Sequence, residues 1–187
     1  VFIVFAYTTT VLIASAYSIG VWYQLQHKDE PLEIGATFVP NYARYFELDP
    51  EETLQAMIDD LGIKRFRLVS YWNMHEKQPD LYDFSELDWQ FDMIEDAGGT
   101  VALSLGLRQP RWPECHGPEW AMAKTVPEWT EDLKEYMGVL IDRYKDREVL
   151  VEYQLENEFL LTVFGDCPDH SRERLIDEFN YVKSKDS

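Results

Sequence analysis

The chain has 187 residues, which is enough to form one substantial hydrophobic core. Its 35 acidic and 17 basic residues give a formal net charge of −18, so phosphate backbones and anionic lipid surfaces repel it and nucleic acid is excluded as a partner. Aromatic residues make up 14% of the chain, a composition that fills a core and also suits neutral polyhydroxylated ligands that stack on rings.

The first 23 residues predict a membrane segment. Val1 to Trp22 carry no charge and would span about 33 Å as a helix, close to the thickness of a bilayer core. A signal peptide cut after Ala16 competes with an uncleaved anchor, and we favour the anchor because the apolar stretch continues to Trp22. A buried soluble helix is the remaining alternative. Either membrane version predicts an extracytoplasmic protein, anchored at the cell surface or secreted.

After a polar linker over residues 24–31, short apolar runs alternate with amphipathic helices, which predicts a parallel sheet. The runs cover residues 32–39, 64–72, 100–106 and 149–156. The first predicted helix has Asp49 as its N-cap and ends at Gly62. The others span residues 85–97, about 125–146 and 172–183. Residues 32–187 therefore contain four βα units.

The four units fit either an open doubly wound sheet or part of a (β/α)8 barrel. A doubly wound sheet usually carries a glycine-rich phosphate turn after its first strand, and this chain has none. Polar and aromatic residues instead follow each apolar run, where a barrel builds its active site. A complete barrel needs about 250 residues, so we expect residues 32–187 to be the N-terminal half of one, a truncated fragment.

The residues that carry the chemistry lie at the end of the fourth run, where Asn157 and Glu158 follow Gln154-Leu-Glu. Glycoside hydrolysis needs one carboxyl group to protonate the leaving oxygen and a second carboxylate to attack the sugar or activate water. Glu156 lies only two residues from Glu158 on one strand, so it cannot face Glu158 across a sugar ring and is interpreted as structural.

Three stretches resemble the clan A glycoside hydrolases, within them the family 5 cellulase-type enzymes: Gln154 to Phe159, Arg65 to Trp72, and the loop and helix start over residues 71–88. The resemblance implies Glu158 as acid/base of a retaining mechanism and Asn157 as ligand of the sugar 2-hydroxyl. It implies that Arg67 reaches the nucleophile, a glutamate on the seventh strand and therefore beyond Ser187. No cofactor is needed for this reaction.

Further candidates for substrate binding have structural alternatives. Arg67 can instead pair with a core carboxylate, and Trp72 and Trp112 are either sugar platforms or buried packing. Arg108, after the third run, either bonds substrate hydroxyls or packs its loop.

The two cysteines, Cys115 and Cys167, either form a disulfide in an oxidising compartment or remain free thiols. Their spacing matches no metal-ligand motif, so no metal site is expected.

The sequence thus predicts a glycosidase that acts on O-glycosidic bonds of a poly- or oligosaccharide. Two alternatives remain: a membrane-anchored barrel that binds carbohydrate without catalysis, and a scaffold. Serine hydrolase and phosphoryl-transfer chemistry lack their GxSxG and GxxxxGK[ST] motifs.

Overall fold

The computed structural model describes residues 2–29, 33–163, 165 and 167–186. The elements follow one another in the order α1 (Phe2–His27), β1 (Gly35–Phe38), α2 (Pro40–Tyr45), α3 (Pro50–Asp59), β2 (Arg65–Val69), α4 (Trp72–His75), α5 (Ser85–Asp96), β3 (Thr100–Leu105), α6 (Glu119–Met122), α7 (Val126–Tyr144), β4 (Leu150–Leu155) and α8 (Arg172–Lys185). They divide into two compact units between Glu33 and Ile34.

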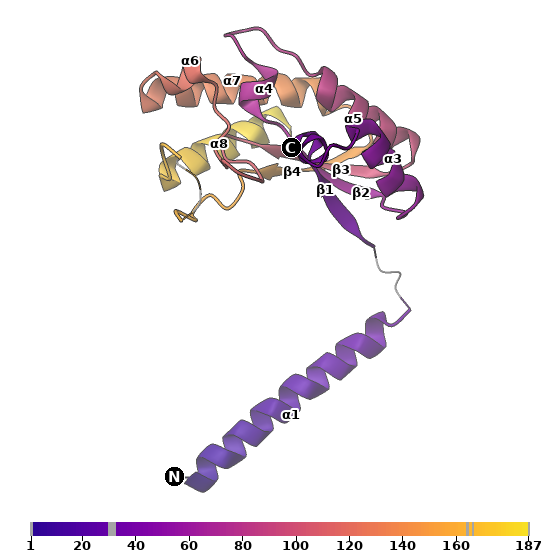
Figure 1. Cartoon of the computed structure of the whole chain (residues 1–187). Helices are drawn as coiled ribbons and strands as arrows, with labels where there is room; N and C mark the ends of the chain where they lie inside the picture. Colours follow the sequence, from indigo (N-terminus) through magenta and orange to yellow (C-terminus); the bar gives the residue numbers. More distant parts are fainter. Residues whose placement is uncertain (1, 30–32, 164, 166, 187) are drawn as a thin grey trace. The chain divides into compact units, whose positions relative to one another are not determined.

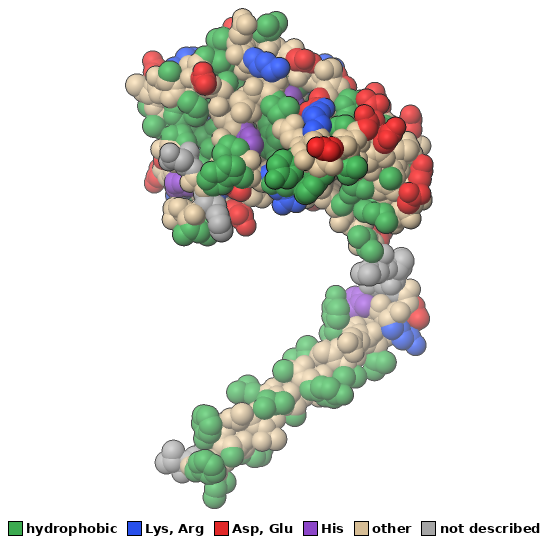
Figure 2. Space-filling model, viewed as in Figure 1, with side chains coloured by type: hydrophobic (Ala, Val, Ile, Leu, Met, Phe, Trp, Pro, Cys, Tyr) green, Lys and Arg blue, Asp and Glu red, His purple; other side chains and the backbone are tan. Residues whose placement is uncertain are grey.

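The first unit is the long helix α1. It has 26 residues, and none of its side chains is buried. It is long and apolar enough to cross a membrane, with a mean hydropathy of 1.7. Hydrophobic and uncharged side chains cover most of its length (Figure 2). The helix continues to His27, past the boundary at residue 23 that the sequence predicts, so the first residues of the predicted linker are helical.

The second unit is built on a parallel sheet in the order β1-β2-β3-β4 (Figure 1). The register aligns Thr37 with Arg67 and Arg67 with Ala102, and after a shift near Val101 it aligns Ala102 with Glu152. Adjacent parallel strands linked by helices, with strand order equal to chain order, are the arrangement of a (β/α)8 barrel. The (β/α)8 fold class predicted from the sequence is therefore confirmed for these four units.

One face of the sheet carries the core. On this face, every second residue of each strand packs against helices α3, α5, α7 and α8. On α5 the predicted face is fully buried, with Leu87, Phe91 and Ile94 all at 0% exposure. Residues at spacings of three and four share one side of a helix, which is why this stripe could be read from the sequence.

The structure also differs from the predicted elements at several boundaries. The second strand ends at Val69 rather than at residue 72, because Trp72 begins the short helix α4. The sequence also missed the short helices α2 and α6, which have too few residues for a hydrophobic period to show. Helix α3 starts as predicted, since the side chain of Asp49 accepts a hydrogen bond from the Glu52 amide at 3.0 Å.

Candidate functional site

The turn after β4 presents Asn157 and Glu158 at the carboxyl end of the sheet. Glu158 has a left-handed backbone with φ of 49°, and so has Glu156 with φ of 56°. The Asn157 amide donates to the Arg108 carbonyl at 2.8 Å, which ties this turn to the loop after β3. The Glu158 side chain is exposed and Asn157 is half-buried. A strained turn that is held by its neighbours is a common device for presenting a functional side chain.

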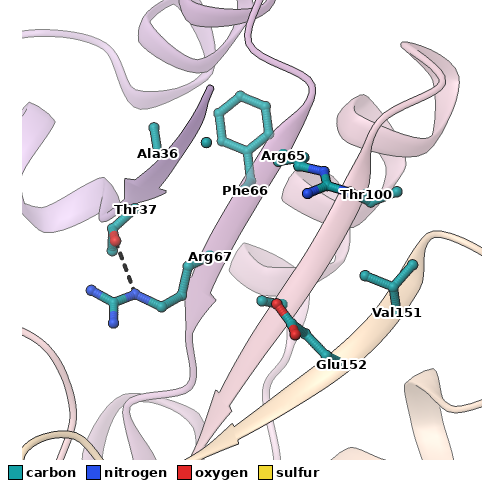
Figure 3. Close-up of a pocket in the computed structure, with 10 residues that line it drawn as sticks. Ala36, Thr37, Arg65, Phe66, Arg67, Thr100, Val151 and Glu152 are labelled. Carbon is teal, nitrogen blue, oxygen red and sulfur yellow. Dashed lines mark hydrogen bonds between the residues drawn. The ribbon is translucent and has the colours of Figure 1, made fainter. Parts of the chain in front are cut away.

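Arg67, on β2, links side chains of β1 and β4. Its Nε donates to Thr37 Oγ1 on β1 at 2.9 Å, and its guanidinium donates to Gln154 Oε1 on β4 at 2.7 Å. Figure 3 shows the Arg67 side chain reaching from β2 toward Thr37. Gln154 in turn donates to Asn157 Oδ1 at 3.2 Å. A chain of polar contacts therefore leads from β1 to the residue beside Glu158.

The Glu158 carboxylate lies within electrostatic range of the Arg67 guanidinium. Burial lowers the pKa of Arg67 from its ordinary value, the positive charge of Arg111 lowers it further, and the Glu158 carboxylate opposes both effects. None of the ion pairs within the described residues includes Arg67. The alternative that Arg67 pairs with a core carboxylate is therefore not what the structure contains.

A buried ionic cluster supports the turn from below. Glu156, 3% exposed, accepts hydrogen bonds from the amides of Leu107 at 2.9 Å and Arg108 at 2.6 Å. Arg174 of α8 contacts Glu156 Oε1 at 2.8 Å and Glu178 Oε1 at 2.5 Å. Burial, followed by the Glu156 charge, raises the pKa of Glu178 to about 8. Glu156 thus joins the ends of β3 and β4, in line with the structural role predicted for it.

Two of the predicted substrate ligands are corrected. Trp72 is 0% exposed, donates from its indole to Glu76 Oε2 at 2.6 Å and stacks on Tyr136, so it offers no face to a sugar. The side chain of Arg108 is 1% exposed and lies 3.9 Å from the Glu114 carboxylate. Both side chains follow a strand end, but both turn inward to pack the βα loops, which is the structural alternative stated for each.

The loop after β3 carries Trp112, Cys115 and His116. Trp112 is 72% exposed, and its role as a sugar platform stays a prediction. A disulfide joins Cys115 to Cys167 with a Cα–Cα distance of 5.5 Å, which is the paired alternative. His116 stacks on Tyr71 with ring centroids 3.9 Å apart, and burial lowers its pKa to about 4, so it is neutral at pH 7.

Sequence reasoning missed two features of this site. Arg174 lies 18 residues from its partner Glu156 in another element, and no periodicity connects them. Arg111 lies close enough to Arg67 to lower its pKa, although Arg67 is on β2 and Arg111 is in the loop after β3. For Gln154 a signal existed, because alternation along β4 places residues 152 and 154 on one side of the strand.

The fold has known counterparts among solved structures. GH5_18 from Streptomyces cattleya, in complex with GlcNAc, superposes with a TM-score of 0.63 and 17% identity over 82% of this chain and 41% of its own. The exo-beta-1,4-mannosidase Op5Man5 from Opitutaceae bacterium strain TAV5 gives 0.60 and 17% over 82% of this chain and 29% of its own. A beta-galactosidase from Halorubrum lacusprofundi gives 0.55 and 18% over 70% and 22%.

The chain has the fold of glycoside hydrolase barrels. It spans about two-fifths of the GH5_18 structure it matches. No protein-family model matches the sequence, and no curated protein matches it. At these identities the likeness establishes the architecture, while activity rests on the site itself.

Proposed function

We propose that this chain supplies the acid/base half of a retaining glycosidase, with Glu158 as the proton donor. The single observation that carries the proposal is the position of Asn157-Glu158 at the carboxyl end of β4, with Arg67 at the same edge of the sheet. In (β/α)8 enzymes catalytic residues come from strand ends at this face. The fold shared with glycoside hydrolases supports the same proposal.

In the proposed reaction, Glu158 protonates the departing glycosidic oxygen while a second carboxylate, about 5–5.5 Å away, attacks the anomeric carbon. Glu158 then acts as a base toward the water that hydrolyses the glycosyl-enzyme. Asn157 would hold the 2-hydroxyl. The described residues form four strands, and the attacking carboxylate is expected from the seventh strand of the full barrel.

Substrates for the first test follow from the structural neighbours. A variant of the Streptomyces cattleya enzyme was solved in complex with Manb1-4GlcNAc, and another neighbour is named an exo-beta-1,4-mannosidase. We therefore propose β-mannosides as the first substrate class to test, using Manb1-4GlcNAc and aryl β-mannosides with good and poor leaving groups.

The decisive variant is Glu158→Gln in the full-length protein. Loss of a general acid is expected to lower kcat/KM, which reports the first step, by about 10²- to 10⁴-fold for poor leaving groups and far less for good ones, because these depart without a proton. Glu173→Gln, which changes an exposed carboxylate on α8, is the control and should leave both rates unchanged. Equal loss on both leaving groups would assign Glu158 another role, and glycan binding without hydrolysis would favour the non-catalytic barrel.

We also propose that α1 anchors the protein in a membrane with the barrel unit outside the cytoplasm. Its length of 26 residues with no buried side chain and the Cys115–Cys167 disulfide support this proposal, because disulfides persist in oxidising compartments. Replacing Leu12 and Ile13 with arginine should release the protein from carbonate-washed membranes. A soluble secreted product that starts after Ala16 would instead identify a cleaved signal peptide.

A further inference from the structure

A groove of about 200 Å³ lies at the carboxyl end of β1, next to the candidate active site. Its walls include Thr37, Tyr42, Phe46, Leu48 and Arg111. Thr37 is shared with the active-site edge, because its hydroxyl accepts the hydrogen bond from Arg67. The groove therefore shares Thr37 with the chain of polar contacts that leads through Arg67 and Gln154 to Asn157.

The apolar wall of the groove is open to solvent. The side chains of Phe46, Leu48 and Tyr42 are 64%, 54% and 41% exposed. Aromatic and aliphatic groups in such a position pack against the C–H face of a sugar ring. Thr37 and the Tyr42 hydroxyl add hydrogen-bonding groups, so the lining suits a sugar rather than a purely apolar ligand.

Arg111 is the charged group of the groove, and its charge is not neutralised within the described part of the chain. Five other arginines pair with a carboxylate within 4 Å: Arg44, Arg108, Arg143, Arg147 and Arg174. Arg111 has no such pair among the described residues, although the protein carries 35 acidic residues. Glu114, three residues on, lies 3.9 Å from Arg108 instead.

Neighbouring residues fix the position of Arg111. Its backbone is left-handed, with φ of 87°, a conformation that costs free energy for a residue other than glycine. The Arg111 carbonyl accepts a hydrogen bond from the Glu114 amide at 2.9 Å and lies 3.3 Å from His116 Nε2. The guanidinium then lies over the Tyr42 ring, 5.4 Å from its centroid. The loop thus holds over the Tyr42 ring a guanidinium that has no carboxylate partner among the described residues.

Arg111 is also close enough to Arg67 for the two positive charges to repel each other. A bound anion between or beside them would relieve this repulsion, and an arginine binds a carboxylate through two parallel hydrogen bonds. Arg67 is already held by Thr37 and Gln154, so Arg111 is the group with donors to offer.

We propose that this groove is a subsite for an acidic sugar, whose carboxylate binds Arg111 while its ring packs on Phe46 and Leu48. The proposal rests on the proposed function, since it names the substrate class of that same site. It predicts that the preferred glycan carries a uronic acid one or more residues from the cleaved bond.

The test compares binding of a β-linked disaccharide that contains glucuronic acid with binding of its neutral glucose counterpart. Binding is measured by isothermal titration in the full-length Glu158→Gln protein, so that hydrolysis does not interfere. We expect the acid to bind at least about fivefold more tightly at 50 mM salt, and the preference to shrink at 300 mM salt as the charges are screened.

Arg111→Gln should abolish this preference, and Arg172→Gln, which removes an exposed arginine on α8, should keep it. Arg111→Gly is a second variant that should lose the preference without losing stability, because glycine favours the left-handed backbone found there. Equal binding of acid and neutral sugar, or a preference retained in Arg111→Gln, would overturn the subsite. Failure of the glycosidase proposal is read separately, from the leaving-group dependence of Glu158→Gln.

Discussion

Replacing Arg174 by methionine should destabilise the barrel unit more than the loss of any exposed ion pair. The side chains of Arg174, Glu156 and Glu178 are at most 3% exposed, and Arg174 is the cation between the two carboxylates. Methionine keeps much of the aliphatic volume, so the change isolates the charge. Without Arg174, the two buried carboxyl groups face each other with no positive charge beside them.

The magnitude follows from the burial. Breaking a buried ion pair by removing one partner costs about 3 to 5 kcal/mol. The guanidinium also lies 4.6 Å from the Phe159 ring centroid, and loss of this contact adds about 0.5 to 1 kcal/mol. We therefore expect a loss of about 4 kcal/mol in the free energy of unfolding, which lowers Tm by roughly 8 to 16 °C for a unit of this size.

The pH dependence of this loss has a definite sign. The pKa of Glu178 is about 8, above its unfolded value, so the folded state retains a proton that the unfolded state releases as the pH rises above about 4.5. This contribution to stability is present at low pH and is lost as the pH rises through 8. Removing Arg174 raises the pKa of Glu178 further, so the deficit of Arg174→Met should be smaller at pH 5.5 than at pH 8.

Urea denaturation followed by tryptophan fluorescence measures these free energies, provided that the m-value is unchanged. The control is Lys134→Met, since Lys134 contacts the more exposed carboxylates of Asp177 and Glu131 at 2.7 and 2.8 Å and should lose less than about 1 kcal/mol. The double variant Arg174→Met/Glu178→Gln should recover part of the stability. If Arg174→Met costs no more than the control, the buried cluster does not support the turn.

Three further predictions concern neighbouring parts of the site. Gly106→Ala should lower the free energy of unfolding by about 2 to 4 kcal/mol, because φ is +105° and a Cβ would lie 2.7 Å from the buried Glu156 carboxylate. Gly62→Ala is the control in the same urea assay: with φ of +66° and open space around it, it should lower the free energy of unfolding by about 1 kcal/mol. Replacing Cys115 and Cys167 by serine should lower stability by up to about 4 kcal/mol, given their separation of 52 residues, and dithiothreitol should then have no further effect on the unfolding midpoint. Burial lowers the pKa of His116 to about 4, so the unfolded chain binds this proton more readily and stability should fall as the pH drops from about 6.5 toward 4. His116→Gln should flatten this dependence of stability on pH. An unchanged dependence would contradict the assignment to His116.

The sequence by itself determined the order of the four strands and of the longer helices between them, and the place of Asn157-Glu158 after the fourth strand. The Asp49 cap and the Leu87, Phe91 and Ile94 stripe are local patterns, because capping and helical periodicity depend only on residues a few positions apart. Asn157-Glu158 was found in the same way, from its place after an apolar run.

Tertiary structure decided which side chains after each strand face the site. Trp72 and Arg108 follow their strands as Glu158 does, yet both are buried, because the direction of a side chain in a loop is set by neighbours distant in sequence. The Arg174 contact to Glu156 and the Arg111 charge beside Arg67 likewise join elements that no local pattern relates. Such pairings depend on how the loops pack on one another, and that is fixed only when the helices close over the sheet.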